Sequence, residues 1–261
     1  MNTSHLTPEK LLGTKPLPED WRQARTAFIC FTPFPNGFLP YVVETAKERY
    51  FLHSPNSEVK LCQYEGHSFW VISEVYGFAV GATTVEELVH YGVETIIGIG
   101  YVGAFKGAAL GQSFLARNTL SDIPLARHYG IGAFEPVYPT ESLYLLVKSC
   151  AEESGMNWGE YRVWNSNSLY RESPELIASI KQAQCEVVNM DTLAIYAVTP
   201  VCAQERNKKI AYLYVGTVTD SEKENGQEEW ESDLLSAVKR EDAHPHDMLV
   251  TFMVEQVLTR L

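Results

Sequence analysis

Short apolar segments alternate with amphipathic segments of helical period along most of the chain. This alternation constrains the fold more than any other feature, because strands that alternate with helices favour an α/β domain. The clearest predicted strands are residues 26–31, 93–100, 113–120, 185–190 and 209–220, and the clearest predicted helices are residues 81–92, 139–155, 173–184 and 191–205. We expect one α/β domain over residues 25–261, preceded by an irregular arm at residues 1–24.

Other segments are less regular. Residues 57–76 predict a β-hairpin that turns at Glu65-Gly66, and residues 38–50 have helical spacing. Residues 161–170 predict a strand that leads into a polar loop, and the acidic segment 221–233 predicts a charged loop followed by helix to the C-terminus. No repeat or low-complexity linker divides the chain, which supports a single domain.

Charge and hydropathy exclude several classes of partner. The 261 residues carry a formal net charge of −12, and an acidic surface repels phosphate backbones and anionic lipid. We therefore expect no nucleic-acid partner and no membrane association. No apolar run approaches the roughly 20 residues that a membrane span needs. The first residues are polar and lack the apolar core of a signal peptide.

Cysteine usage and the known cofactor motifs add further limits. The 5 cysteines are scattered without a CxxC pair, which is typical of buried thiols in a reducing cytoplasm. Residues 244–247 read HPHD, but Pro245 fits the first turn of a terminal helix, so we expect no metal site there. No Walker loop, HExxH, GxSxG or complete dinucleotide fingerprint occurs, and we expect no cofactor.

The segment IIGIGYVGAF, residues 96–105, predicts a strand that runs into a glycine-rich turn. Gly98, Gly100 and Gly103 lie close together with Tyr101 among them. Glycine lets another group approach the backbone closely, and that group is either a ligand or a neighbouring strand.

Polar residues at predicted strand ends are candidates for chemistry. Asp220 closes an apolar strand, where partial desolvation raises an aspartate pKa toward that of a general acid, or it only caps a turn. Asp191 opens a buried helix, where it caps the helix or accepts hydrogen bonds from a ligand diol. The stretch WNSNSLY, residues 164–170, is a wall of ligand-binding groups or a simple turn.

Four stretches, in order, resemble the nucleoside phosphorylase/nucleosidase superfamily, which includes purine nucleoside and uridine phosphorylases. They are VEELVHYGVETIIGIGYVGAF at 85–105, VWNSNSLY at 163–170, CEVVNMDTLAIYAV at 185–198 and VGTVTDSE at 215–222. The resemblance implies a single three-layer α/β domain with a mixed, barrel-like central β-sheet flanked by helices. It also implies a homo-oligomer (a dimer, trimer or hexamer) that cleaves N-glycosidic bonds of small nucleosides without an organic cofactor.

The same resemblance assigns roles to individual residues. Asp220 matches the acid that protonates the leaving base, Met190 lies beneath the ribose, and Asp191 matches the glutamate that holds the sugar diol. Leu169 matches the ring that stacks on the base, with Tyr170 beside it. The further expected contacts are Asn167 and Arg171 on the base side, Phe34 and Gly103 in the pocket, and His5 of the arm at a neighbouring subunit.

The sequence departs from this family at the phosphate site. Gly98 and Tyr101 stand where the phosphorylases have an arginine and a Ser/Thr, and no arginine or lysine occurs from residue 31 to 43. Glu74 stands where a small polar residue is usual. Each charge interaction at about 4 Å is on the order of 4 kcal/mol at an effective dielectric constant of about 20. We therefore expect Tyr101 to fill the phosphate corner and phosphorolysis to be lost.

Two functions remain open after this loss. In the first, water replaces phosphate and the protein is a nucleoside hydrolase, with Glu74 as the base for water and Asp220 as the acid. In the second, the scaffold has a new apolar ligand, which it only binds or converts by isomerase- or cyclase-type acid chemistry at Asp220. The aromatic residues expected to line that pocket are Phe34, Phe38, Tyr76, Phe78, Tyr101, Phe105, Trp164 and Tyr170.

Overall fold

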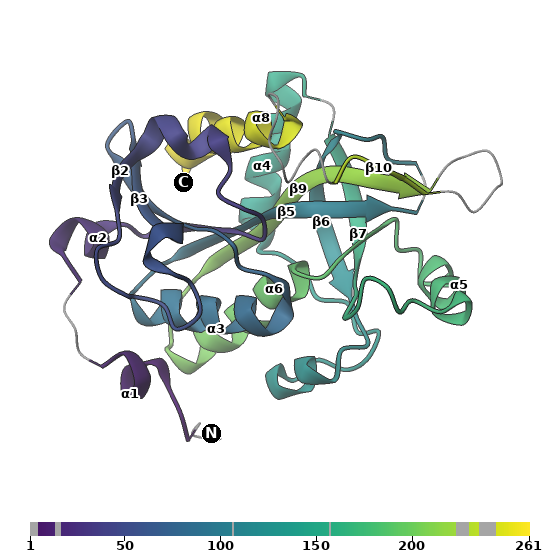
Figure 1. Ribbon diagram of the computed structural model, residues 1–261, viewed down its shortest axis with the longest axis horizontal. Coiled ribbons are helices and arrows are strands. Elements are labelled where there is room, and N and C mark those ends of the chain that lie inside the picture. Colours follow the sequence, from purple (N-terminus) through teal and green to yellow (C-terminus); the bar gives the residue numbers. More distant parts are fainter. Residues whose placement is uncertain (1–4, 14–16, 106, 157, 223–229, 235–243) are drawn as a thin grey trace.

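Two long strands, β5 (Thr95–Ala104) and β9 (Ala211–Glu222), run parallel through the centre of the molecule and organise its sheet (Figure 1). This arrangement is seen in a computed structural model, which describes residues 5–13, 17–105, 107–156, 158–222, 230–234 and 244–261. The sheet contains ten described strands in the order β10-β9-β6-β7-β8-β5-β1-β4-β3-β2.

Part of the sheet closes on itself. Strands β6 (Ser113–Leu120), β7 (Trp158–Asn165) and β8 (Val187–Asn189) connect the free edge of β9 to β5, and β5 pairs directly with β9. The ring β9-β6-β7-β8-β5 is therefore a five-stranded barrel with parallel and antiparallel pairs. This confirms the expected mixed, barrel-like sheet in a single α/β domain.

The other strands extend the sheet from β5. Strand β1 (Thr26–Cys30) pairs in parallel with both β5 and β4 (His67–Ile72), and β4 forms a hairpin with β3 (Val59–Tyr64). The hairpin turns at Glu65 and Gly66, as the sequence predicts.

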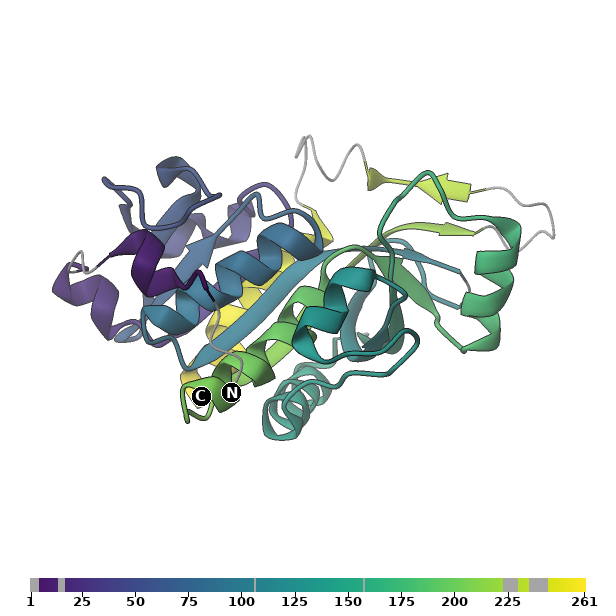
Figure 2. The same cartoon turned by 90° about the horizontal axis from the view of Figure 1, so that it is seen from below.

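Helices cover both faces of the sheet, which gives three layers. Helices α3 (Gly77–His90) and α6 (Thr192–Glu205) lie side by side on one face (Figure 2), and α4 (Glu141–Ser154) and α8 (Pro245–Phe252) lie on the other (Figure 1). One core cluster lies beneath α3 and α6, and a second lies beneath α4 and α8.

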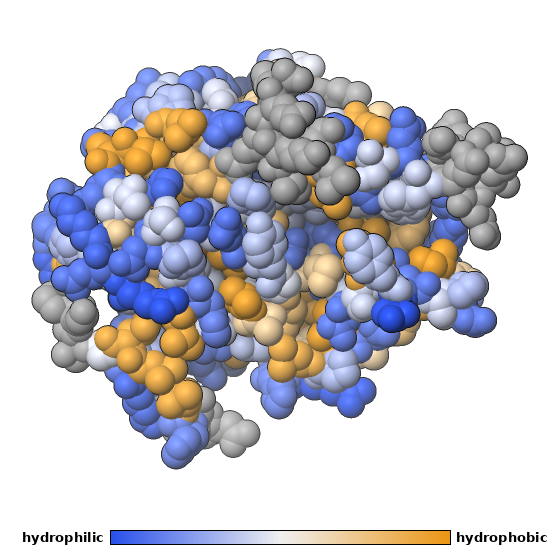
Figure 3. Space-filling model, viewed as in Figure 1, coloured by the Kyte–Doolittle hydropathy of each residue, from blue (hydrophilic) through white to orange (hydrophobic). Residues whose placement is uncertain are grey.

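The remaining elements are short and complete the described chain. They are α1 (Pro8–Leu12), α2 (Glu19–Gln23), β2 (Val42–Thr45), α5 (Pro174–Gln182), β10 (Trp230–Ser232), the 3₁₀ turns η1 (Asn36–Tyr41), η2 (Asn56–Glu58), η3 (Pro124–Tyr129) and η5 (Leu258–Arg260), and the π turn η4 (Met253–Val257). Helix α5 begins as predicted, because the Ser173 hydroxyl accepts a hydrogen bond from the Leu176 N–H. The surface seen in Figure 3 is largely hydrophilic with scattered apolar groups.

Three expectations for the elements need correction. The predicted helix at 38–50 is wrong, because Pro40 limits helix to the 3₁₀ turn η1, and the chain continues as β2 on the sheet edge. The glycine-rich segment is not a turn, because β5 continues to Ala104 with β9 on one side and β8 on the other. Part of the expected charged loop is the strand β10, and residues 223–229 lie outside the described residues.

Candidate functional site

Asp220 lies near the carboxyl end of β9, half-buried, with both carboxylate oxygens hydrogen-bonded. Its Oδ2 accepts a hydrogen bond from the Trp230 indole N–H at 2.6 Å, and its Oδ1 accepts one from the Thr219 hydroxyl at 2.9 Å. Gly103 lies opposite Asp220 in the register of β5. A Cβ atom at Gly103 would lie 2.7 Å from Oδ2, so the glycine makes room for this carboxylate.

Asp191 lies between the N-termini of two helices. It immediately precedes α6, and its Oδ1 accepts a hydrogen bond from the N–H of Gly77, the first residue of α3, at 3.0 Å. Asp191 is only 9% exposed, and this burial raises the pKa of its carboxyl group to about 7, although the hydrogen bond from Gly77 opposes the rise. The carboxylate therefore joins α3 to α6. It does not cap α6, whose first N–H groups donate to the side chains of Asn189 and Asn165 instead.

The glycines of β5 accommodate a side chain of the protein. A Cβ atom at Gly98 would lie 2.5 Å from the ring of Tyr214, and a Cβ atom at Gly100 would overlap the Tyr214 hydroxyl. Tyr214 is on β9, directly opposite Gly98, and is fully buried. The group that packs closely against Gly98 and Gly100 is therefore a side chain of the neighbouring strand and not a ligand.

The hydroxyl of Tyr214 is in an unusual environment. It has no hydrogen-bond partner within the part of the chain that the structure describes, although it faces Asp191 and Asn189. Burial and the nearby carboxyl group of Asp191 raise the pKa of Tyr214 well above its usual value. Sequence reasoning missed this residue, because its position over Gly98 and Gly100 depends on how β5 and β9 pair.

Tyr101 packs elsewhere than expected. Its ring lies 4.5 Å from that of His246 and 5.9 Å from that of His244, centroid to centroid, near the start of α8. His246 Nδ1 lies 3.1 Å from the Thr217 hydroxyl, and His244 Nδ1 accepts a hydrogen bond from the His246 N–H. Tyr214, and not Tyr101, thus fills the corner over Gly98 and Gly100.

Glu74 follows β4 at a point close to the end of β1. Its N–H donates to the carbonyl of Thr32 at 2.9 Å, and Thr32 lies two residues beyond β1. Glu74 is exposed and has a φ of 57°, a left-handed conformation that non-glycine residues seldom adopt. The same segment leads to Gly77 and thus to Asp191, so the ends of β1 and β4 and the start of α6 are brought together.

The loop after β7 is attached to α6 at its base and exposed at its tip. The Asn165 amide oxygen accepts a hydrogen bond from the Leu193 N–H at 2.9 Å, and the Ser166 N–H donates to the carbonyl of Asn189. Farther along this loop the expected base-side residues Asn167, Leu169, Tyr170 and Arg171 are exposed, Leu169 at 54% and Tyr170 at 88%. Met190, between Asn189 and Asp191, is half-buried.

The aromatic residues expected around an apolar pocket do not surround one cavity. Phe38 packs on Phe28 and Phe69 in one core cluster, Phe78 packs in a second, and Phe105 and Trp164 belong to a third. Phe34 is half-buried, with its ring centroid 6.0 Å from that of Phe38. Four of the eight rings, those of Phe38, Phe78, Phe105 and Trp164, therefore fill the core, whereas Tyr76 and Tyr170 are exposed.

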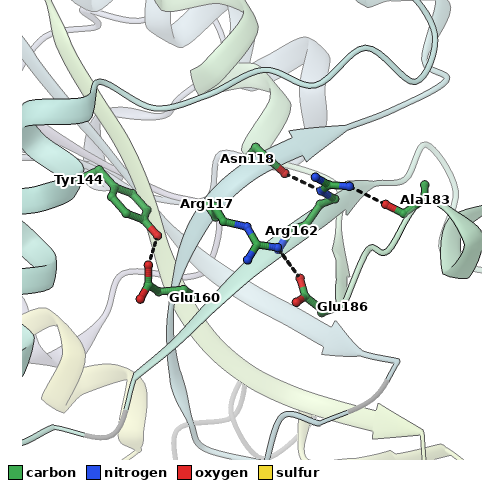
Figure 4. Close-up of polar contacts among 7 residues, drawn as sticks. All are labelled: Arg117, Asn118, Tyr144, Glu160, Arg162, Ala183 and Glu186. Carbon is green, nitrogen blue, oxygen red and sulfur yellow. Dashed lines mark hydrogen bonds and ion pairs between the residues drawn. The ribbon is translucent and has the colours of Figure 1, made fainter.

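Several cations near the barrel are already paired, as Figure 4 shows. Arg117 lies 3.3 Å from a carboxylate oxygen of Glu186, and Arg162 donates to the side chain of Asn118 and to the carbonyl of Ala183. These contacts connect β6 and β7 to the segment before β8. The guanidinium groups have structural partners there, so they do not supply the cationic donors that a phosphate site requires.

Two further features are absent from the described residues. Within the described ranges, no group of three or more His, Cys, Asp or Glu side chains is arranged to hold a metal ion. No helix among the described residues is long and apolar enough to span a membrane.

The fold is that of a known family. The family model of the phosphorylase superfamily matches residues 25–253, and the chain belongs to this superfamily. An uncharacterized protein of Acanthamoeba polyphaga mimivirus is 36% identical over 245 residues, which cover 93% of each chain.

Two solved structures have the same fold at low sequence identity. The 5′-methylthioadenosine/S-adenosyl homocysteine nucleosidase of Campylobacter jejuni has a TM-score of 0.66 at 11% identity, covering 90% of this chain and 99% of that one. A futalosine hydrolase mutant of Helicobacter pylori has a TM-score of 0.64 at 13% identity, covering 91% of this chain and 100% of that one. The fold is thus that of nucleoside phosphorylases and nucleosidases.

Proposed function

We propose that this protein hydrolyses the N-glycosidic bond of a nucleoside or a nucleoside analogue. The observation that carries the proposal is the ring of Tyr214 over Gly98 and Gly100, because it occupies the corner where the resemblance places an arginine for phosphate. A phosphate dianion needs cationic donors or free backbone N–H groups, and a buried phenol supplies no positive charge. The solved structures of similar fold are named as a nucleosidase and a hydrolase, which agrees with water as the acceptor.

Asp220 acts as the general acid in this proposal. Its carboxylate is held near the end of β9 by Thr219 and Trp230, and it packs against Gly103, where a Cβ atom would lie 2.7 Å from Oδ2. Protonation of the leaving base by Asp220 lets the bond between the base and the sugar C1′ break without forming an anion. Glu74 takes a proton from the attacking water, so the products are the free base and the free sugar, and the two carboxyl groups exchange one proton per turnover.

The other expected residues bind the substrate. Asp191 accepts hydrogen bonds from the sugar diol, Met190 packs against the sugar, and Asn167, Leu169, Tyr170, Arg171 and Phe34 contact the base side. The substrate is a small molecule. A homo-oligomer and a cytoplasmic location stay predictions from the resemblance and from cysteine usage.

The test compares base release from purine and pyrimidine nucleosides with and without inorganic phosphate. We expect release whose rate does not increase with phosphate, and we expect Asp220→Asn to lower kcat by at least about 100-fold. Asp122→Asn, which changes an exposed aspartate before η3, is the matched control and should keep the activity of the wild type. Release that requires phosphate would overturn the assignment of water as the acceptor.

A further inference from the structure

Trp230 lies against the proposed acid and is not part of the core. It is the first residue of β10, which pairs antiparallel with the end of β9 so that Ser232 lies opposite Asp220. All five tryptophans lie among the described residues, and Trp230 is the exposed one, at 45%. Sequence reasoning missed it because EEWESD is a charged segment in which a lone tryptophan has no periodic partner.

The indole covers the side of Asp220 that a ligand needs. Its N–H donates to Oδ2 at 2.6 Å, and its Cζ2 atom would lie 2.9 Å from a Cβ atom at Gly103. The Thr219 hydroxyl already donates to the other oxygen. A nucleobase can therefore form a hydrogen bond with Oδ2 only if it displaces the indole N–H. Otherwise it contacts the indole ring.

The ring is well placed to pack on a planar group. Phe105 supports it at a centroid distance of 6.4 Å with an interplanar angle of 72°, and Trp230 is still 45% exposed. Stacking of a base on an aromatic side chain contributes about 1–3 kcal/mol.

We propose that Trp230 is a specificity-determining residue: its indole moves off Oδ2 of Asp220 when substrate enters and stacks on the planar leaving base. The proposal rests on the proposed function for the identity of the substrate. It requires that β10 shifts relative to the end of β9. Among the described residues, three residue pairs and a hydrogen bond from the Asp233 N–H to the Thr219 carbonyl join these segments. The indole thus satisfies the carboxylate in the empty site and selects aromatic leaving groups in the occupied one.

The first experiment compares the kinetics of Trp230→Phe and Trp230→Ala on the nucleosides that the wild type cleaves. Phenylalanine keeps a stacking ring, so KM should stay within about threefold of the wild type, whereas alanine should raise KM by about tenfold or more. An unchanged KM for Trp230→Ala would overturn the proposal and leave the hydrolase assignment intact.

The second experiment follows tryptophan emission as adenine, hypoxanthine or uracil is added to the full chain. We expect an emission change in the wild type and no change in Trp230→Phe. Trp158→Phe is the control and should keep the change, because the Trp158 ring packs on Phe252. If bases change the emission through Trp230 but no nucleoside is cleaved, the proposed function fails while the stacking role stands. An emission change that persists in Trp230→Phe, or no change with any base, overturns the stacking role.

Discussion

At the scale of single residues, Tyr214 has a hydroxyl group buried beside the side chains of Asp191 and Asn189. The ring is fully buried, and its oxygen has no hydrogen-bond partner among the described residues. A buried polar group without a partner costs about 1–3 kcal/mol. The contribution of Tyr214 to stability therefore comes from its ring, which fills the space over Gly98 and Gly100, and not from its hydroxyl group.

Tyr214→Phe should therefore leave the free protein as stable as the wild type or more stable, by on the order of 1 kcal/mol. Tyr196→Phe is the matched control, because its buried hydroxyl donates to the Ala116 carbonyl at 2.7 Å and accepts from the Tyr214 N–H at 3.2 Å. The control should lose on the order of 2 kcal/mol. Urea denaturation followed by circular dichroism measures both, and equal losses in the two variants would contradict this account of Tyr214.

At the scale of elements, the sequence predicts those whose signals are local. The apolar strands, the hairpin at Glu65-Gly66 and the Ser173 cap of α5 all follow from residues within one turn or one strand. The helical spacing of residues 38–50 predicts the wrong structure, because Pro40 and the edge position of β2 outweigh it. The length of β5 was underestimated because glycine usually ends a strand, and here the facing side chains of β9 fill the space.

The junction of α3 and α6 depends on one buried carboxyl group, and its titration should control stability. Burial raises the pKa of Asp191 from 3.8 to about 7. The stability that its protonated form contributes is complete below about pH 4, where both states are protonated, and is lost as the pH rises to about 7. The difference between 3.8 and about 7 corresponds to on the order of 4 kcal/mol.

Asp191→Asn keeps an oxygen that accepts from the Gly77 N–H and removes the titration. Two buried amide donors offset part of the gain, so at pH 8 the variant should exceed the wild type in unfolding free energy by on the order of 2 kcal/mol. The gain should disappear near pH 4. Asp122→Asn, at an exposed aspartate, should show no such pH dependence. The test measures the unfolding free energies of the variants and the wild type between about pH 4 and pH 8. A gain in Asp191→Asn that does not vary with pH would refute the role of Asp191 ionisation.

At the scale of the whole molecule, the site depends on contacts that no local pattern predicts. Asp191 meets Gly77 across 114 residues, and Gly103 of β5 lies opposite both Val188 of β8 and Asp220 of β9. The sequence pattern correctly predicts Asp191 at the start of α6, whereas Asp220 does not close its strand, because β9 continues to Glu222. Their neighbours Trp230 and Tyr214 could not be predicted, because closure of the barrel brings them there.

The shared strands also predict how the molecule unfolds. Strands β5 and β9 contribute to both core clusters, with Ile96 and Tyr214 in one and Ile97 and Leu213 in the other. The barrel and the outer strands β1 to β4 therefore cannot separate without exposing the central pair. We expect a single cooperative transition, with the same midpoint by far-ultraviolet circular dichroism and by tryptophan fluorescence.

Two buried valines, one on each side of β5 in the sheet, test this coupling. Val163→Ala on β7 lies in the barrel, and Val71→Ala on β4 lies in the outer strands, and both side chains are fully buried. Each substitution should cost about 2 kcal/mol and lower the melting temperature by about 4–8 °C. Both probes should shift together in both variants, because the barrel and outer strands share β5. The opposite result would be unfolding in two steps, with the substitution lowering the midpoint of only one of them. It would show that the barrel and the outer strands unfold as separate units.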